Sequence, residues 1–206
     1  MKPDLHSWPP ESRHDPFLGQ WVLAATIADT AMIAQCGPGS AAALLLALGL
    51  GLVAAQIAWQ DLADMTIPDE ALVGLGLLGL VSRLYTGVLR GDAPEWILAA
   101  ASLDGFVCAG ALLGLREVYF RRRGRDGIGF GDVKLAVSGG ILVGTVDFAW
   151  SVLGASLAGL VLVGLARLHL GAARGVLVTE DQIAFGALLA PALWIAWLLA
   201  ATPLLL

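Results

Sequence analysis

Two acidic segments lie beside apolar stretches of this chain, and their aspartates are the residues best suited to chemistry. The first reads Asp-Leu-Ala-Asp-Met-Thr-Ile-Pro-Asp over residues 61–69, and the second reads Gly-Phe-Gly-Asp-Val-Lys-Leu over residues 129–135. Ionisable groups are costly next to hydrocarbon, so acids at the ends of membrane helices are candidates for a functional site. Two carboxyl groups that meet at a membrane surface could carry out aspartic protease chemistry.

Peptide hydrolysis by paired carboxyls needs one ionised aspartate to accept a proton from water and one protonated aspartate to donate to the carbonyl oxygen. Two carboxyls in contact do not both ionise easily, so they share one proton. Asp132 is expected at a helix start, where the helix dipole favours its ionised form while burial opposes it; the sequence leaves open which effect is larger. Gly129 and Gly131 permit positive φ and close backbone approach, which would let Asp132 project toward its partner.

Each acid also has an interpretation without chemistry. Asp132 could be only the N-cap of the helix that follows it, and Asp61 could be a solvated helix end. Asp64 lies one turn from Asp61 and could tune it or simply be solvated. We favour Asp61 as the partner of Asp132, because it directly follows Trp59 and Gln60 at the membrane boundary, where partial desolvation favours a shared proton.

The neighbouring residues of both segments have predicted roles as well. Lys134 could steady the Asp132 carboxylate or a substrate, or its ammonium group could reach the lipid headgroups. Pro68 breaks the chain, so Asp69 and Glu70 are predicted to begin the next helix.

The composition indicates an integral membrane protein. Of the 206 residues, 58% are hydrophobic and 14% are charged, against about 25% charged residues in soluble domains. A helix needs about 20 apolar residues to cross a bilayer, and long continuous apolar runs are typical of helices and not of barrel strands. We therefore predict an all-α polytopic bundle of about seven transmembrane helices, near residues 17–34, 41–60, 71–89, 96–120, 133–148, 150–170 and 183–204.

The domain organisation is predicted to be simple. A polar cytoplasmic tail over residues 1–16 precedes one polytopic membrane domain over residues 17–206. The tail carries Asp4, Glu11 and Asp15 among its basic residues, whereas a secretory signal has a positive start and a small-residue cleavage site. We expect the first predicted helix to be retained.

The distribution of Lys and Arg predicts the orientation in the membrane. If the second predicted helix ends in the cytoplasm, ten of the twelve Lys and Arg residues lie on that side, Arg90 lies outside and Arg83 lies within a span. Cytoplasmic loops carry an excess of Lys and Arg, so we expect both acidic segments and the N-terminus to be cytoplasmic. The net charge of −5 does not indicate a nucleic-acid-binding protein. Cys36 and Cys108 are isolated, so neither a metal site nor a cofactor is expected.

Together the two segments resemble the motifs of the type IV prepilin peptidases, which are membrane aspartyl proteases of the Gly-x-Gly-Asp type. In that family an Asp ends a transmembrane helix seven positions before a Pro that is followed by Asn or Asp, as Asp61 stands before Pro68 here. A Gly-x-Gly-Asp-x-Lys-Leu run follows later, as at residues 129–135. A third element, Phe185-Gly186, is similar to the family's Pro-Phe-Gly-Pro run, with Ala184 and Ala187 in place of the prolines.

The resemblance covers about residues 41–206 and implies that Asp61 and Asp132 are the catalytic pair. It implies prepilin or pseudopilin substrates, whose short basic leader precedes a hydrophobic helix and is cleaved at the cytoplasmic face of the bacterial inner membrane. Such cleavage serves type IV pili or related protein secretion. Longer family members carry a methyltransferase domain with paired Cys-x-x-Cys motifs, so this chain resembles a short form that is a peptidase only.

Two rival functions belong to other classes. A small transporter or proton channel could use acids inside predicted spans, such as Asp29 and Asp104. We expect these two to be structural polar contacts instead, because such residues usually face the bundle interior and pair with neighbours. The position of the motif acids at one face, and not near the midplane, also argues against a transporter. A non-catalytic assembly scaffold could keep the fold, but it would have no chemical need for both Asp61 and Asp132.

Overall fold

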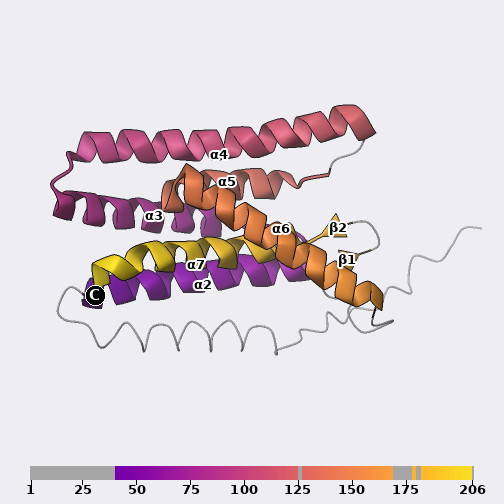
Figure 1. Cartoon of the computed structure of the whole chain (residues 1–206), viewed down its shortest axis with the longest axis horizontal. Helices are drawn as coiled ribbons and strands as arrows, with labels where there is room; N and C mark the ends of the chain where they lie inside the picture. The colour runs from indigo at the N-terminus through magenta and orange to yellow at the C-terminus, as the bar shows by residue number, and fades with distance from the viewer. Residues whose placement is uncertain (1–39, 125–126, 169–177, 180–181, 206) are drawn as a thin grey trace, which may run out of the picture.

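The computed structural model describes residues 40–124, 127–168, 178–179 and 182–205. This part of the chain forms six helices and one antiparallel pair of two-residue strands (Figure 1). The helices are α2 (Ser40–Asp64), α3 (Asp69–Arg90), α4 (Pro94–Arg123), α5 (Phe130–Val143), α6 (Thr145–Leu168) and α7 (Phe185–Leu205). The strands are β1 (Val178–Thr179) and β2 (Gln182–Ile183).

The helices pack as two groups, one around α5 and one around α7. Helix α5 packs against α3 and α4, helix α7 packs against α2 and α6, and α5 and α7 also contact each other. Figure 1 shows that α2, α3, α4 and α7 run nearly parallel in this view, whereas α6 crosses them obliquely. The last turn of α2 and the first turns of α3, α5 and α7 lie at the same end of the bundle. Both acidic segments therefore reach one surface.

The predicted all-α membrane class is confirmed, but the count of about seven spans is not. Among the residues that the structure describes, α2, α3, α4 and α6 are long and apolar enough to cross a membrane, and α7 is a shorter apolar helix. The first predicted span, residues 17–34, and the polar tail, residues 1–16, lie outside the described residues.

The predicted boundary between the fifth and sixth spans is wrong. The sequence predicts helices over residues 133–148 and 150–170, but α5 ends at Val143 and α6 already begins at Thr145. Gly144 separates them with φ 85° and ψ 167°, a backbone conformation that favours glycine. Helix α5 has 14 residues and is about 21 Å long, which is too short for a hydrocarbon core of about 30 Å.

Three buried side chains tie the helices together by hydrogen bonds. The Trp194 indole donates to the Ala47 carbonyl at 3.1 Å, and the Trp197 indole donates to the Ser82 hydroxyl at 2.8 Å. The Ser138 hydroxyl donates to the Leu72 carbonyl at 2.8 Å and joins α5 to α3. Helix association in a bilayer depends on close packing and on interhelical hydrogen bonds, because lipid tails are as apolar as the side chains.

Helix α5 also lies very close to the backbone of α4. A Cβ atom added to Gly140 would lie 2.6 Å from the carbonyl oxygen of Asp104 and 2.9 Å from the sulfur of Cys108. Such distances leave no room for a methyl group, so glycine at this position lets the two helices approach.

We therefore expect Gly140→Ala to destabilise the fold by about 1–3 kcal/mol, because overpacking forces backbone shifts of this cost. Thermal unfolding in detergent measures the effect. Gly110→Ala is the matched control, since nothing lies within 4 Å of a Cβ at that position of α4 and alanine favours helix over glycine. Equal melting temperatures for the two variants would contradict the close packing.

Candidate active site

Asp61 lies in the last turn of α2 and is buried, with 6% of its surface exposed. Its carboxyl oxygen accepts a hydrogen bond from the backbone N–H of Ala187 at 2.8 Å. Its own carbonyl accepts the N–H of Met65 at 3.0 Å, and Met65 adopts a positive φ of 53° that ends the helix. The helix ends one turn after the acid, and the Asp61 side chain is held against the start of α7.

Asp132 lies in the first turn of α5 and is also buried, with 8% of its surface exposed. The interpretation of Asp132 as an N-cap is wrong, because the cap position is Gly129 and the helix begins at Phe130. The Asp132 carboxyl folds back toward Gly129, where an added Cβ would lie 3.3 Å from its oxygen. The carboxyl thus lies over the helix entry from within the first turn, and it is buried there.

The glycines beside Asp132 act through close approach and not through positive φ. Gly129 has φ −64°, and the glycines with positive φ in the described part of the chain lie elsewhere. A Cβ at Gly131 would lie 3.3 Å from the side chain of Ile67. The expectation of positive φ at Gly129 and Gly131 is therefore wrong. Both residues have ordinary backbone angles at the helix start, and glycine matters there because neighbouring atoms lie close to where a side chain would be.

The two buried carboxyls influence each other. Burial raises the pKa of the Asp132 carboxyl, and the negative charge of Asp61 raises it further, to about 6, although the backbone N–H of Gly129 opposes this change. The competition that the sequence left open is decided in favour of desolvation. Asp132 can thus hold a proton at a pH where an ordinary aspartate is ionised.

Ile67 fills the space between the backbone segments that carry the site. A Cβ at Gly131 would lie 3.3 Å from its Cδ1 atom, and a Cβ at Gly186 would lie 2.8 Å from the same atom. The start of α5 and the start of α7 therefore both pack against this one side chain. Ile67 is not among the residues predicted from the sequence to belong to the site; its position directly before Pro68 within the first motif is the signal that could have indicated it.

Lys134 points away from the pair. Its ammonium group binds the carboxylate of Asp69 at 2.6 Å, and both side chains are largely exposed. The structure therefore favours neither the predicted contact of Lys134 with Asp132 nor a free side chain among the headgroups. Pro68 is the residue before α3, and Asp69 and Glu70 form its first turn, as the sequence predicts.

Asp64 differs from Asp61 in its surroundings. It is the last residue of α2 and its side chain is exposed. The bundle thus brings Asp61 and Asp132 into one buried site and leaves Asp64 at its edge.

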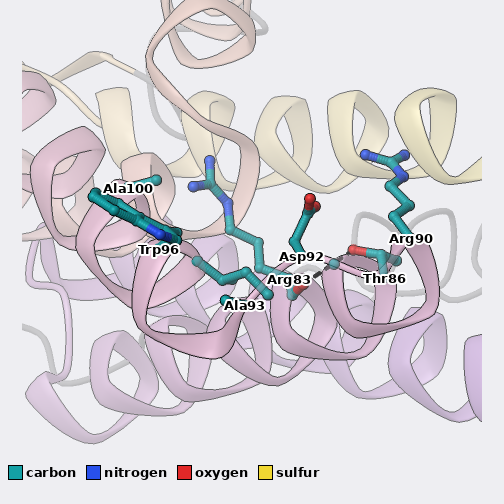
Figure 2. Close-up of a pocket in the computed structure, with 9 residues that line it drawn as sticks. Arg83, Thr86, Arg90, Asp92, Ala93, Trp96 and Ala100 are labelled. Atoms are coloured by element: carbon teal, nitrogen blue, oxygen red, sulfur yellow. Dashed lines mark hydrogen bonds between the residues drawn. The ribbon is translucent and has the colours of Figure 1, made fainter.

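Asp104 belongs to a separate polar group. Its carboxylate binds the guanidinium of Arg83 at 2.7 Å and the hydroxyl of Thr145 at 2.6 Å, so its charge is compensated. Arg83 also lines an open cavity of about 530 Å³ at the end of α3 and the start of α4, where Figure 2 shows it with Arg90 and Trp96. This cavity lies at the opposite end of α3 from the acidic pair. Asp29 lies outside the described residues.

Residues 41–164 match the sequence model of the type IV leader peptidase family. The chain belongs to this family. The matched segment holds both Asp61 and Asp132 and ends before α7. No curated protein and no solved structure matches the chain significantly.

Membership confirms the resemblance that the two motifs predicted and makes the chain a membrane peptidase. A leader peptidase needs groups that can transfer protons at a peptide bond. In the described part of this peptidase, no cluster of three or more His, Cys, Asp or Glu residues could hold a metal ion. The buried Asp61 and Asp132 supply two carboxyl groups that can transfer protons in this way.

The raised pKa of Asp132 predicts a pH-dependent stability difference between the peptidase and its Asp132→Asn variant. The folded pKa of about 6 lies above the ordinary value of 3.8, so the folded state binds this proton more tightly than the unfolded state. The protonated Asp132 carboxyl therefore contributes its full stabilisation of the folded wild type below about pH 4, and this contribution is lost as the pH rises through about 6. The asparagine variant should be more stable by up to about 3 kcal/mol at pH 8, and equally stable near pH 4.

Thermal unfolding in detergent across this pH range measures the difference. Asp64→Asn is the control, because that side chain is exposed and its replacement should not produce such a pH-dependent gain. A gain for Asp132→Asn that is the same at pH 4 and pH 8 would contradict a buried ionised carboxyl at the higher pH.

Proposed function

We propose that this chain is an aspartic endopeptidase that cleaves the leader peptides of type IV prepilin-like proteins at the cytoplasmic face of the membrane. The observation that carries the proposal is the meeting of Asp61 and Asp132, which come from separate helices and are both buried at one end of the bundle. The family match supports the peptidase class. The expected location is the bacterial inner membrane, with the N-terminus in the cytoplasm.

The pair would act by general acid–base catalysis. The ionised carboxylate takes a proton from water while the water oxygen bonds to the peptide carbonyl carbon, and the protonated carboxyl gives its proton to the carbonyl oxygen. The resulting diol collapses when the C–N bond breaks: the nitrogen receives the proton taken from water, and one diol hydroxyl returns a proton to the other carboxyl. Both carboxyls then have their starting protonation states, and no cofactor is needed.

The surface around the pair supports a basic leader as the substrate. Asp64 and Glu70 are exposed beside the site, and Asp69 is exposed although it also binds Lys134. Carboxylates that face water attract Lys and Arg residues of a substrate, mainly by guiding its approach. The hydrophobic helix that follows the leader would remain in the bilayer beside the bundle. Such substrates are pilins or pseudopilins of pili or related secretion systems.

The transporter alternative has weaker support. Asp104, which lies within a predicted span, is paired with Arg83 and Thr145 and joins three helices. A compensated acid of this kind stabilises a bundle, whereas a proton pathway needs an acid that can exchange its proton.

The first test of this function is cleavage of a purified prepilin with a basic leader. We expect wild-type cleavage, and a loss of about 10³-fold or more in kcat/KM for Asp61→Asn and for Asp132→Asn, because general acid–base catalysis by each group contributes up to about 10⁴-fold. The double variant should be hardly slower than either single one, since residues that act as one unit are not additive.

Asp64→Asn is the matched control for this assay and should keep most of the activity. An inactive Asp64→Asn with an active Asp61→Asn would reassign the partner of Asp132 while leaving the peptidase class intact. Wild-type turnover by Asp132→Asn would overturn the proposed mechanism.

A further prediction concerns orientation. Single cysteines placed in a background without Cys36 and Cys108 should be labelled from the cytoplasmic side at Arg122. A cysteine at Asp92, in the turn between α3 and α4, should be labelled from the outside. The reason is the excess of Lys and Arg on the proposed cytoplasmic side. Labelling of position 122 by an impermeant reagent added outside intact cells would reverse the orientation.

A further inference from the structure

The two carboxyls of the proposed site have different partners. Asp61 accepts the backbone N–H of Ala187 in a buried hydrogen bond of 2.8 Å, and the backbone N–H of Gly186 also interacts with it. Asp132 faces the charge of Asp61 and the N–H of Gly129. A backbone N–H only donates, and it binds an ionised oxygen more strongly than a neutral one. The two carboxyls thus differ in how strongly their surroundings stabilise the ionised form, even without substrate.

We propose that the first turn of α7 fixes Asp61 as the ionised member of the pair, with Ala187 as a positioning residue that acts through its backbone N–H. Asp61 is then the group that takes the proton from water, and Asp132 is the group that gives its proton to the carbonyl oxygen. This assignment rests on the proposed function and adds the role of each carboxyl to it.

The geometry of α7 fits this role. The first N–H groups of a helix have no partner within the helix, and the helix dipole favours negative charge at that end. Helix α7 begins at Phe185, so the amides of Gly186 and Ala187 are in its first turn. A Cβ at Gly186 would lie 3.0 Å from the bound oxygen of Asp61. Glycine there lets the helix start reach the carboxylate.

Other charges around Asp61 do not provide the same asymmetry. Helix α7 has no ionisable side chain within Phe185–Leu205. The remaining ionisable groups near this end of α2, α3 and α5 are exposed, namely Asp64, Asp69, Glu70 and Lys134, and the last of these binds Asp69. From α4, the half-buried Arg116 faces the ring of Phe130, with its guanidinium carbon 5.8 Å from the ring centre. Exposed charges are screened by water and salt. The described groups that act on Asp61 at close range are therefore Asp132 and the amides of α7.

Residue 187 decides whether the hydrogen bond can exist. The run that this segment resembles has proline at this position, and proline has no backbone N–H. Alanine supplies the donor here. Helix α7 also lies beyond the segment that matches the family model, so the match itself does not assign this contact.

The test replaces Ala187 by lactic acid in cell-free translation, which changes the backbone amide to an ester and removes the N–H while keeping the side chain. In the prepilin cleavage assay, we expect the acidic limb of the kcat/KM profile to move to higher pH by about one unit, with a tenfold loss below the limb, as for a hydrogen bond to a charged group. Activity above the acidic limb should stay close to that of the wild type. A merely structural role would lower the rate at every pH.

Two ordinary variants complete the test. Ala187→Gly keeps the N–H and should keep the wild-type acidic limb. Ala187→Pro removes an N–H that has no partner within the helix and should move the limb in the same direction as the ester. An unmoved limb in both the ester and the proline variants, or an equal shift in Ala187→Gly, would overturn the assignment. Absence of prepilin cleavage by the wild type would instead overturn the proposed function.

Discussion

Two carboxyl groups buried side by side cannot both be ionised without a large cost, because each loses its water and repels the other. Asp61 and Asp132 are both buried, with 6% and 8% of their surfaces exposed, and the charge of Asp61 acts on Asp132. The pair lowers its free energy by keeping one proton, which is the state that hydrolysis of a peptide bond requires. The same burial that weakens the fold near neutral pH therefore prepares the site.

The bundle brings this pair together by ending several helices at one level. Helix α2 ends just after Asp61, and α5 begins just before Asp132. Ile67 lies between Gly131 and Gly186, so the starts of α5 and α7 are close to the same loop. Because α5 is only 14 residues long, it can begin at this level and end inside the bundle at Gly144.

The sequence predicts the chemical residues better than their surroundings. The motif acids, the membrane class and the break at Pro68 follow from spacing and composition, since these depend on local sequence. The boundary at Gly144 does not, because apolar residues continue on both sides, and the break depends on the positive φ of Gly144 and on the Arg83 guanidinium packed beside it. The hydrogen bond from Ala187 to Asp61 joins residues 126 positions apart, so no local pattern contains it.

The neighbours of each acid in this bundle determine whether it has a structural or a chemical role. Asp104 is bound by Arg83 and Thr145, and that arrangement joins α3, α4 and α6 as a structural contact. Asp132 faces another acid, and the nearby Lys134 binds Asp69 instead. A buried acid with a cation is held in one charge state, whereas a buried acid beside another acid can gain and lose a proton at moderate cost. That difference separates the acid that stabilises the fold from the acid that can do chemistry.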